Sequence, residues 1–242
     1  AEAFRRLIAT ADVLIENFRT GALDGLGFDY SSLRAINKRL IYTSISGFGR
    51  SGRFSDYKAY DQVVQGSSGV MSTTGTKDTA PLKMGAPVID YGTGVYAAFA
   101  ISAALLAREK TGEGQKIDIS MFDVAMMFQG PQLVRFLRDR VEPQPRGNDG
   151  ALATTCCFQT KNGLLIVAAG NIKLRNRLWT LLGRPELATD DYATALRLFE
   201  HERTVLATIF GSRTAQEWED YLQTHGIPAA MVRTFAQAAD PD

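Results

Sequence analysis

Apolar and polar positions follow a regular order along residues 1–140, and this order predicts helices and strands in turn. Short apolar runs indicate buried strands, and wider amphipathic stretches indicate helices. The expected segments are a helix at 1–10, a strand at 11–15, a helix at 31–37, a strand at 40–46, helices at 61–71 and 92–107, a strand at 115–120 and a helix at 121–138. This alternation predicts a layered α/β domain.

The apolar pattern stops at residues 141–150, where two prolines and two glycines indicate a linker. We therefore expect a large domain at 1–140 and a small α+β domain at 151–242. Two apolar runs within 153–169 flank Lys161-Asn162-Gly163, which predicts a β-hairpin because Asn-Gly tolerates positive φ at both positions. Helices are expected at 172–182, 192–210 and 215–224, the last opened by a capping box from Thr214 to Glu217.

Composition adds limits on partners and location. The chain has 242 residues, and its 27 Lys and Arg stand against 26 Asp and Glu without charge runs, which argues against nucleic acid and membrane surfaces as partners. The apolar stretch Val95 to Ala107 is shorter than the roughly 20 residues of a membrane span, so a buried helix is expected. No signal peptide is visible at residues 1–10, which favours the cytoplasm. The chain starts without Met and stops in a connection-like segment, as expected of a fragment.

Three further patterns favour structural roles. Cys156 and Cys157 are adjacent in an apolar run and are expected to be packing residues. His201 and His225 lack ligands at metal-binding spacing, so neither a metal site nor a Ser-His-Asp triad is expected. Gly47 to Gly52 fits G-x-G-x-x-G, but a polar aromatic loop follows it where dinucleotide binding needs a helix. A glycine-rich surface loop is the better interpretation.

Asp90 carries the main candidate chemistry. It ends the run Ala86 to Ile89 and precedes Tyr91-Gly-Thr-Gly94, after which an apolar helix is expected. One interpretation is an N-cap that accepts hydrogen bonds from free backbone N–H groups. The other is a nucleophile on a strand-to-helix turn, with backbone N–H groups around Gly92 to Gly94 stabilising an oxyanion. Local chemistry does not choose between them.

Five short stretches in chain order carry a resemblance: Ile15 to Leu23 (IENFRTGAL), Ser44 to Gly49 (SISGFG), Lys58 to Asp61 (KAYD), Asp90 to Gly94 (DYGTG) and Lys110 to Gln115 (KTGEGQ). Together they resemble the class III CoA-transferases, the family of formyl-CoA transferase and carnitine CoA-transferase. The resemblance continues through 183–187 and 226–229, so it covers essentially the whole chain.

The resemblance implies an incomplete Rossmann-like large domain plus a small α+β domain, in subunits that form an interlocked homodimer. It places the catalytic aspartate at Asp90. It assigns CoA contacts to two segments, Asn17, Phe18 and Arg19, and Tyr57, Lys58, Ala59 and Tyr60. Core packing is the alternative for Phe18 and Tyr60, which adjoin apolar strands, and a plain surface position is the alternative for Lys58.

The implied reaction is transfer of CoA from an acyl-CoA to a small carboxylic acid, through an aspartyl anhydride and an aspartyl-CoA thioester. It uses the CoA thioester as substrate and no metal or prosthetic group. Two departures matter. The family often has arginine where this chain has Gly25, and oxalate-using members have a glycine run where this chain has only Gly147-Asn-Asp-Gly150.

Two other functions remain open. The α-methylacyl-CoA racemases resemble the transferases, but they need a histidine base where this chain has Tyr60, whose ordinary pKa of about 10 suits proton abstraction poorly. A non-catalytic CoA-binding or assembly subunit is the second alternative.

Overall fold

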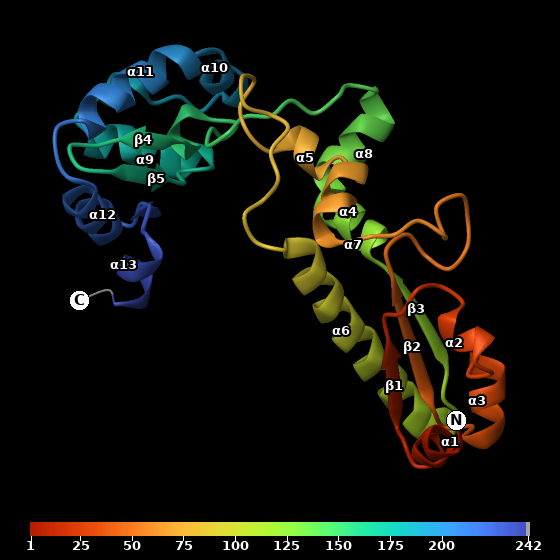
Figure 1. Cartoon of the computed structure of the whole chain (residues 1–242). Helices are drawn as coiled ribbons and strands as arrows, with labels where there is room; N and C mark the ends of the chain where they lie inside the picture. The colour runs from red at the N-terminus through yellow and green to blue at the C-terminus, as the bar shows by residue number, and fades with distance from the viewer. Residues whose placement is uncertain (241–242) are drawn as a thin grey trace. The chain divides into compact units, whose positions relative to one another are not determined.

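A computed structural model describes residues 1–240, which divide into two compact units, one up to Pro145 and the other from Arg146 onward. The border between the units falls within the 141–150 segment whose composition predicts a linker. Each unit has its own sheet, as Figure 1 shows, and buried side chains give each its own hydrophobic core.

The first unit is built on a three-stranded parallel sheet in the order β1-β2-β3. Val13 pairs with Ile41 at the start of the β1–β2 ladder, and Ser46 pairs with Ser120 at the end of the β2–β3 ladder. Its elements are α1 (Glu2–Ile8), β1 (Val13–Glu16), α2 (Ala22–Gly25), α3 (Tyr30–Ile36), β2 (Ile41–Ser46), α4 (Asp61–Ser67), α5 (Val70–Thr73), α6 (Val88–Thr111), β3 (Lys116–Ser120), α7 (Met121–Phe128) and α8 (Gly130–Asp139). All three predicted strands of this unit are therefore present.

Helices cover both faces of this sheet. Leu40, just before β2, and Tyr42 of β2 pack with Leu33 of α3 and Ile8 of α1, while Ile41 points to the other face and packs against Ile101 of α6. Figure 1 shows the same layers, with α6 on one side of the strands and α3 on the other. Successive side chains of β2 thus point to opposite faces and join two apolar layers, which is the arrangement expected of a parallel sheet.

Three of the predicted helices are interrupted. Residues 61–71 break at Gly69, whose φ of 86° lies in the left-handed region and ends the helical run. Residues 121–138 break at Gln129, because Pro131 has no N–H to continue the ladder and begins a new helix. Residues 192–210 divide at Leu198.

Helix α6 differs most from its prediction. It runs for 24 residues and begins at Val88, four residues before the expected start. Only one face is buried, through residues such as Thr93, Ala97 and Ala104, whereas Val95 and Phe99 are largely exposed. The buried helix that the sequence predicts is therefore covered on one face in this chain, where the sheet packs against it. Among the described residues, α6 is the one helix with the length and apolar composition to cross a membrane, and core helices share both properties.

The second unit is an antiparallel sheet in the order β4-β5-β6, covered by helices. Its elements are β4 (Cys157–Gln159), β5 (Leu164–Val167), α9 (Ile172–Leu181), α10 (Tyr192–Arg197), α11 (Phe199–Phe210), α12 (Ala215–Thr224), β6 (Ala229–Met231) and α13 (Phe235–Ala239), with 3₁₀ turns at Ala153–Thr155 and Pro185–Leu187. The hairpin around Asn162-Gly163 and the capping box at Thr214 are confirmed.

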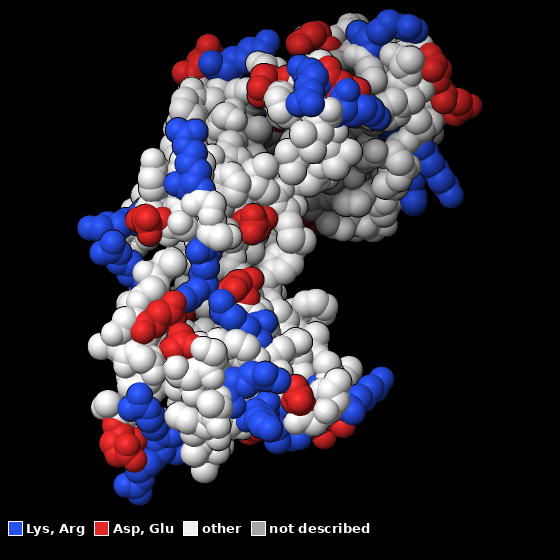
Figure 2. All heavy atoms as spheres, turned by 90° about the vertical axis from the view of Figure 1, so that its right-hand side faces the viewer, with Lys and Arg blue, Asp and Glu red and all other residues white. Residues whose placement is uncertain are grey.

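The core of this unit packs Trp179, Phe210 and Trp218 against Cys156 and the strands. Both cysteines are free and buried, and burial raises the pKa of Cys156 to about 11, so its thiol stays protonated at neutral pH. The core also encloses an ion pair between Arg175 and Glu202, both with fully buried side chains. Figure 2 shows Lys and Arg interspersed with Asp and Glu over one face of the molecule.

Candidate active site

A pocket of about 640 Å³ opens at the carboxyl ends of the parallel strands in the first unit. Residues 17–20 follow β1, residues 55–60 lie on the loop after β2, and residues 90, 93 and 94 lie in the first turns of α6. Met121 closes the wall at the end of β3. Ligands of open parallel sheets bind at this edge, because the loops that follow the strands converge there.

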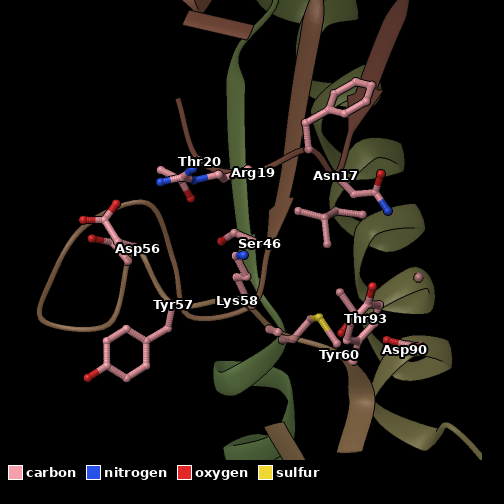
Figure 3. A pocket seen from close by; sticks show the side chains of 17 residues that line it. Asn17, Arg19, Thr20, Ser46, Asp56, Tyr57, Lys58, Tyr60, Asp90 and Thr93 are labelled. Carbon is pink, nitrogen blue, oxygen red and sulfur yellow. The ribbon is translucent and has the colours of Figure 1, made fainter. Parts of the chain in front are cut away.

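All eight residues that the sequence singles out line this one pocket. They are Asn17, Phe18, Arg19, Tyr57, Lys58, Ala59, Tyr60 and Asp90. Figure 3 shows Lys58 and Ser46 toward the middle of the pocket, with Asp56 on one side and Asp90 on the other. The structure brings together three segments separated by up to 73 positions, and the roles of these residues stay predictions.

Phe18 and Tyr60 do not serve the core. Their exposed fractions are 61% and 74%, although each lies within two residues of a buried side chain, Glu16 for Phe18 and Asp61 for Tyr60. The core-packing alternative is therefore wrong for both. Two exposed aromatic rings on the wall of a pocket offer flat apolar surface to a ligand.

Asp90 lies inside α6, in the third position of its first turn, and is not the cap. The N-cap is Pro87, which has no side-chain acceptor, so the N-cap interpretation of Asp90 is wrong. The residues before Val88 form no strand, so the strand-to-helix turn is wrong as well. Gly92 to Gly94 belong to the helix, whose N–H groups bond to carbonyls one turn earlier, which removes them as oxyanion donors.

The first N–H groups of α6 are bound by a residue that sequence reasoning missed. Asp61, the first residue of α4, accepts hydrogen bonds through Oδ2 from the N–H of Ile89 at 2.8 Å and of Asp90 at 3.1 Å. Its side chain is buried, and its other oxygen accepts from Gln65. A signal was available, since Asp61 directly follows the pocket residue Tyr60 and is the last residue of the KAYD motif.

A second missed group supports the opposite wall. The buried Glu16, at the end of β1, accepts from the N–H of Phe18 at 2.9 Å, from the Ser44 hydroxyl and from Arg50 at 3.1 Å. Arg50 also binds Asp24 of α2 at 2.6 Å. This Glu16–Arg50 network fixes the turn that carries Asn17 to Arg19 into the pocket.

The pocket holds charges that the protein itself leaves unmatched. Within residues 1–240, neither Arg19 nor Lys58 forms an ion pair. The carboxylate of Asp90 accepts no hydrogen bond from this part of the chain. Partial desolvation, with a smaller contribution from the charge of Asp61, raises the pKa of Asp90 above its ordinary value.

The two glycines that follow Asp90 have different surroundings. A side-chain carbon at Gly92 would collide with Phe128 of α7, so glycine allows α6 and α7 to approach closely here. Gly94 lines the pocket, and a side chain there would meet open space. No cluster of His, Cys, Asp or Glu suited to a metal ion occurs in the described residues, and no histidine lines the pocket.

Comparison with known proteins gives consistent matches. The model of the CoA-transferase family III matches residues 1–242. The succinate–glutarate CoA-transferase of Agrobacterium fabrum is 39% identical over 243 residues, which are 98% of this chain and 61% of that protein. The acetyl-CoA:oxalate CoA-transferase of Acetobacter aceti is 37% identical over 248 residues, with 98% and 62% covered.

Solved structures agree in fold. The crystal structure of a CAIB/BAIF family protein from Brucella suis matches with a TM-score of 0.82 and 37% identity, over 99% of this chain and 65% of that one. The predicted combination of helices and sheets is confirmed by this match. The chain spans 61–65% of the length of these three relatives.

Proposed function

Because the chain belongs to CoA-transferase family III, we propose that it transfers coenzyme A from an acyl-CoA to a small carboxylic acid, with Asp90 as the nucleophile. One observation carries the proposal: the pocket presents an exposed carboxylate to which residues 1–240 donate no hydrogen bond, beside cations that they leave unpaired and exposed aromatic rings. The carboxylate suits covalent exchange, the cations suit phosphate binding, and the aromatic rings suit the apolar parts of CoA.

In the first half-reaction, an Asp90 oxygen attacks the acyl carbonyl carbon and the C–S bond breaks. CoA leaves as a thiolate that carries the electron pair, and Asp90 becomes a mixed anhydride. The thiolate then attacks the Asp90 carbonyl carbon, which releases the donor acid as a carboxylate and leaves an aspartyl-CoA thioester. The acceptor carboxylate reverses both steps with its own carbon skeleton, so Asp90 is regenerated without a net proton.

The walls of the pocket have separate roles in this proposal. Arg19 and Lys58 are the cations for the phosphates of CoA, because charge-assisted hydrogen bonds to phosphate are strong and both side chains are free. Phe18, Tyr57 and Tyr60 supply the aromatic surface, and Asn17 and Ala59 complete the two CoA-binding segments. No prosthetic group takes part in these steps.

The names of the curated relatives suggest which acids to test first. Succinate, glutarate and oxalate are all dicarboxylates, so a short dicarboxylate is the proposed acceptor. This chain lacks the glycine run of the oxalate-using members, since Gly147-Asn-Asp-Gly150 has a single glycine at each end. We therefore expect succinate and glutarate to be better acceptors than oxalate.

We also propose a cytoplasmic homodimer with interlocked subunits. The exposed apolar side chains of α6, among them Tyr91, Val95, Phe99 and Leu106, support further coverage of this helix. Size-exclusion chromatography with light scattering tests the dimer. A well-dispersed monomer would contradict it.

The main test measures exchange of isotope-labelled CoA between an acyl-CoA and succinate, with the full-length protein and its Asp90→Ala variant. We expect exchange in the wild type, an adduct on Asp90 by mass spectrometry, and no exchange in the variant. CoA binding should persist, because the variant keeps both CoA segments. Exchange in Asp90→Ala would refute the proposed nucleophile.

The same protein separates the two alternatives. A racemase would incorporate deuterium at C2 of a 2-methylacyl-CoA in deuterated water, and we expect none because no histidine lines the pocket. A binding subunit would bind CoA without exchange or an adduct.

A further inference from the structure

Two carboxylates, Asp61 and Asp90, lie at the start of α6, and only that of Asp61 binds the helix N–H groups. An aspartate in the first turn of a helix is normally stabilised by the free N–H groups and by the helix dipole. At α6 those groups are engaged elsewhere: Val88 donates to the carbonyl of Ala86, and Ile89 and Asp90 donate to Asp61. The carboxylate of Asp90 therefore has no backbone donor among the described residues.

We propose that Asp61 is a positioning residue for CoA transfer: its buried carboxylate binds the N–H groups that open α6, fixes the backbone of Asp90 and keeps the Asp90 carboxylate free to attack. This inference rests on the proposed function, because it assumes that Asp90 is the nucleophile. Asp61 acts through Asp90 and does not itself line the pocket.

The chemical benefit follows from what hydrogen bonds do to a carboxylate. Donors that bind the ionised form stabilise it, which lowers both its pKa and its nucleophilicity. By taking the N–H groups, Asp61 prevents that stabilisation. Its own charge adds repulsion, which is relieved when Asp90 loses its charge in forming the anhydride.

The electrostatic environment of Asp90 makes Asp61 the relevant neighbour. Arg19 and Lys58 also line the pocket, and so does Asp56, which Figure 3 shows on the other side from Asp90. Partial desolvation raises the pKa of Asp90 most, and the charge of Asp61 raises it further.

Gln65 completes the arrangement. It is fully buried on α4, donates its amide N–H to Asp61, and accepts through Oε1 from the N–H of Met84 at 2.9 Å. The pair therefore ties α4 both to the loop before α6 and to the first turn of α6. Gln65 lies one helical turn after Asp61 on α4. A glutamate at position 65 could therefore carry the negative charge in place of Asp61.

The test moves the charge and keeps the hydrogen bonds. In Asp61→Asn alone, the new amide meets the Gln65 amide, and one hydrogen bond is lost. In the double variant Asp61→Asn with Gln65→Glu, the introduced amide oxygen still faces Ile89 and Asp90. Its NH₂ donates to the carboxylate introduced at position 65, which also accepts from the N–H of Met84. The double variant thus keeps the fold testable if the single variant unfolds.

The readout is the rate of Asp90 adduct formation from acyl-CoA against pH, measured with the full-length protein. We expect the acid limb to move to lower pH in the double variant, because the pKa of Asp90 falls when the nearby charge moves away. At neutral pH the rate should fall several-fold, because the Asp90 carboxylate loses the repulsion that anhydride formation relieves. Asp61→Ala, which removes the acceptor of both N–H groups, should lower the rate by about tenfold to a hundredfold, because the backbone of Asp90 is released. Asp78→Asn, at an exposed aspartate outside the pocket lining, is the matched control, and it should leave the limb unchanged.

Wild-type adduct formation by folded Asp61→Ala, or an unchanged rate and an unchanged limb in the folded double variant, would overturn this inference. That result would leave the proposed function standing, as long as wild type forms the adduct. Failure of the wild type to form an adduct on Asp90 would instead overturn the proposed function.

Discussion

The two units treat charged side chains in opposite ways. In the second unit, Arg175 and Glu202 are fully buried, pair with each other, and Arg175 also donates to the carbonyl of Leu187 at 2.9 Å. In the pocket of the first unit, Asp90, Arg19 and Lys58 are exposed and have no ionic partner in the described chain. Charge that is enclosed is matched within the fold, whereas charge at the pocket is left for a ligand to match. The comparison predicts that disturbing the first arrangement affects folding and disturbing the second affects binding and turnover.

The largest effect is expected from breaking the enclosed pair. Glu202→Gln leaves the buried guanidinium of Arg175 without its counter-ion, which should lower the free energy of unfolding by about 3–5 kcal/mol. Urea unfolding measures this loss. The control replaces both partners, Arg175→Met with Glu202→Leu, and should be far less destabilising because no uncompensated charge remains. Equal destabilisation by the single and double changes would contradict the assignment of this cost to an unpaired charge.

The Glu16–Arg50 network lies between the two extremes, and its removal should affect both properties. Arg50→Ala leaves Glu16 buried with fewer partners, which should lower the free energy of unfolding by about 1–3 kcal/mol. The segment Asn17 to Arg19 loses support, so KM for acyl-CoA should rise several-fold while kcat changes less. Steady-state kinetics and urea unfolding together measure this split.

Arg53→Ala is the matched control for Arg50→Ala, because it removes a cation from the same loop that only stacks on Phe54. It should leave stability and KM nearly unchanged. A loss of stability in Arg50→Ala with an unchanged KM would show that the network supports the fold alone.

The smallest effect has the opposite sign and sharpens the comparison most. The pKa of Asp90 in the folded protein is raised above its ordinary 3.8, so folding is penalised once pH exceeds that value. Stability therefore falls as pH rises from 3.8 through the raised pKa, and the penalty persists at neutral pH. Asp90→Asn should be slightly more stable than wild type at pH 7, with no difference below about pH 3.

Thermal unfolding at the two pH values measures the effect of Asp90→Asn, with Asp56→Asn as a control on the other side of the pocket. A variant less stable than wild type at pH 7 would mean that the Asp90 carboxylate makes stabilising contacts.

Sequence patterns predict the features that depend on neighbours along the chain. The three parallel strands, the hairpin at Asn162-Gly163 and the capping box at Thr214 each have a local signal. The start of α6 has none, because its capping group, Asp61, lies 27 residues before Val88. Strand β6 also lacks a signal, because Ala229 to Met231 has weak strand propensity and forms a strand by pairing with β5.

The candidate site shows the same limit. The motif resemblance identifies eight residues that line one pocket, but their support by Asp61 and by the Glu16–Arg50 network depends on contacts across the fold. Whether Phe18 and Tyr60 turn inward or outward also does not follow from the adjacent strands. Their exposure depends on the loops that follow those strands.

Helix α6 packs against neighbouring elements at two places along its length, and the two contacts together fix its direction. Gly92 seats it against α7 near the pocket, and Ile101 and Ala104 seat it against the sheet. Ala104 lies about 21 Å along the axis from Asp90, so a pivot of about 3° there would carry the nucleophile by about 1 Å. The contact between Gly92 and α7 blocks this rotation of the helix. The position of the Asp90 carboxylate therefore depends partly on packing contacts that lie away from the substrate.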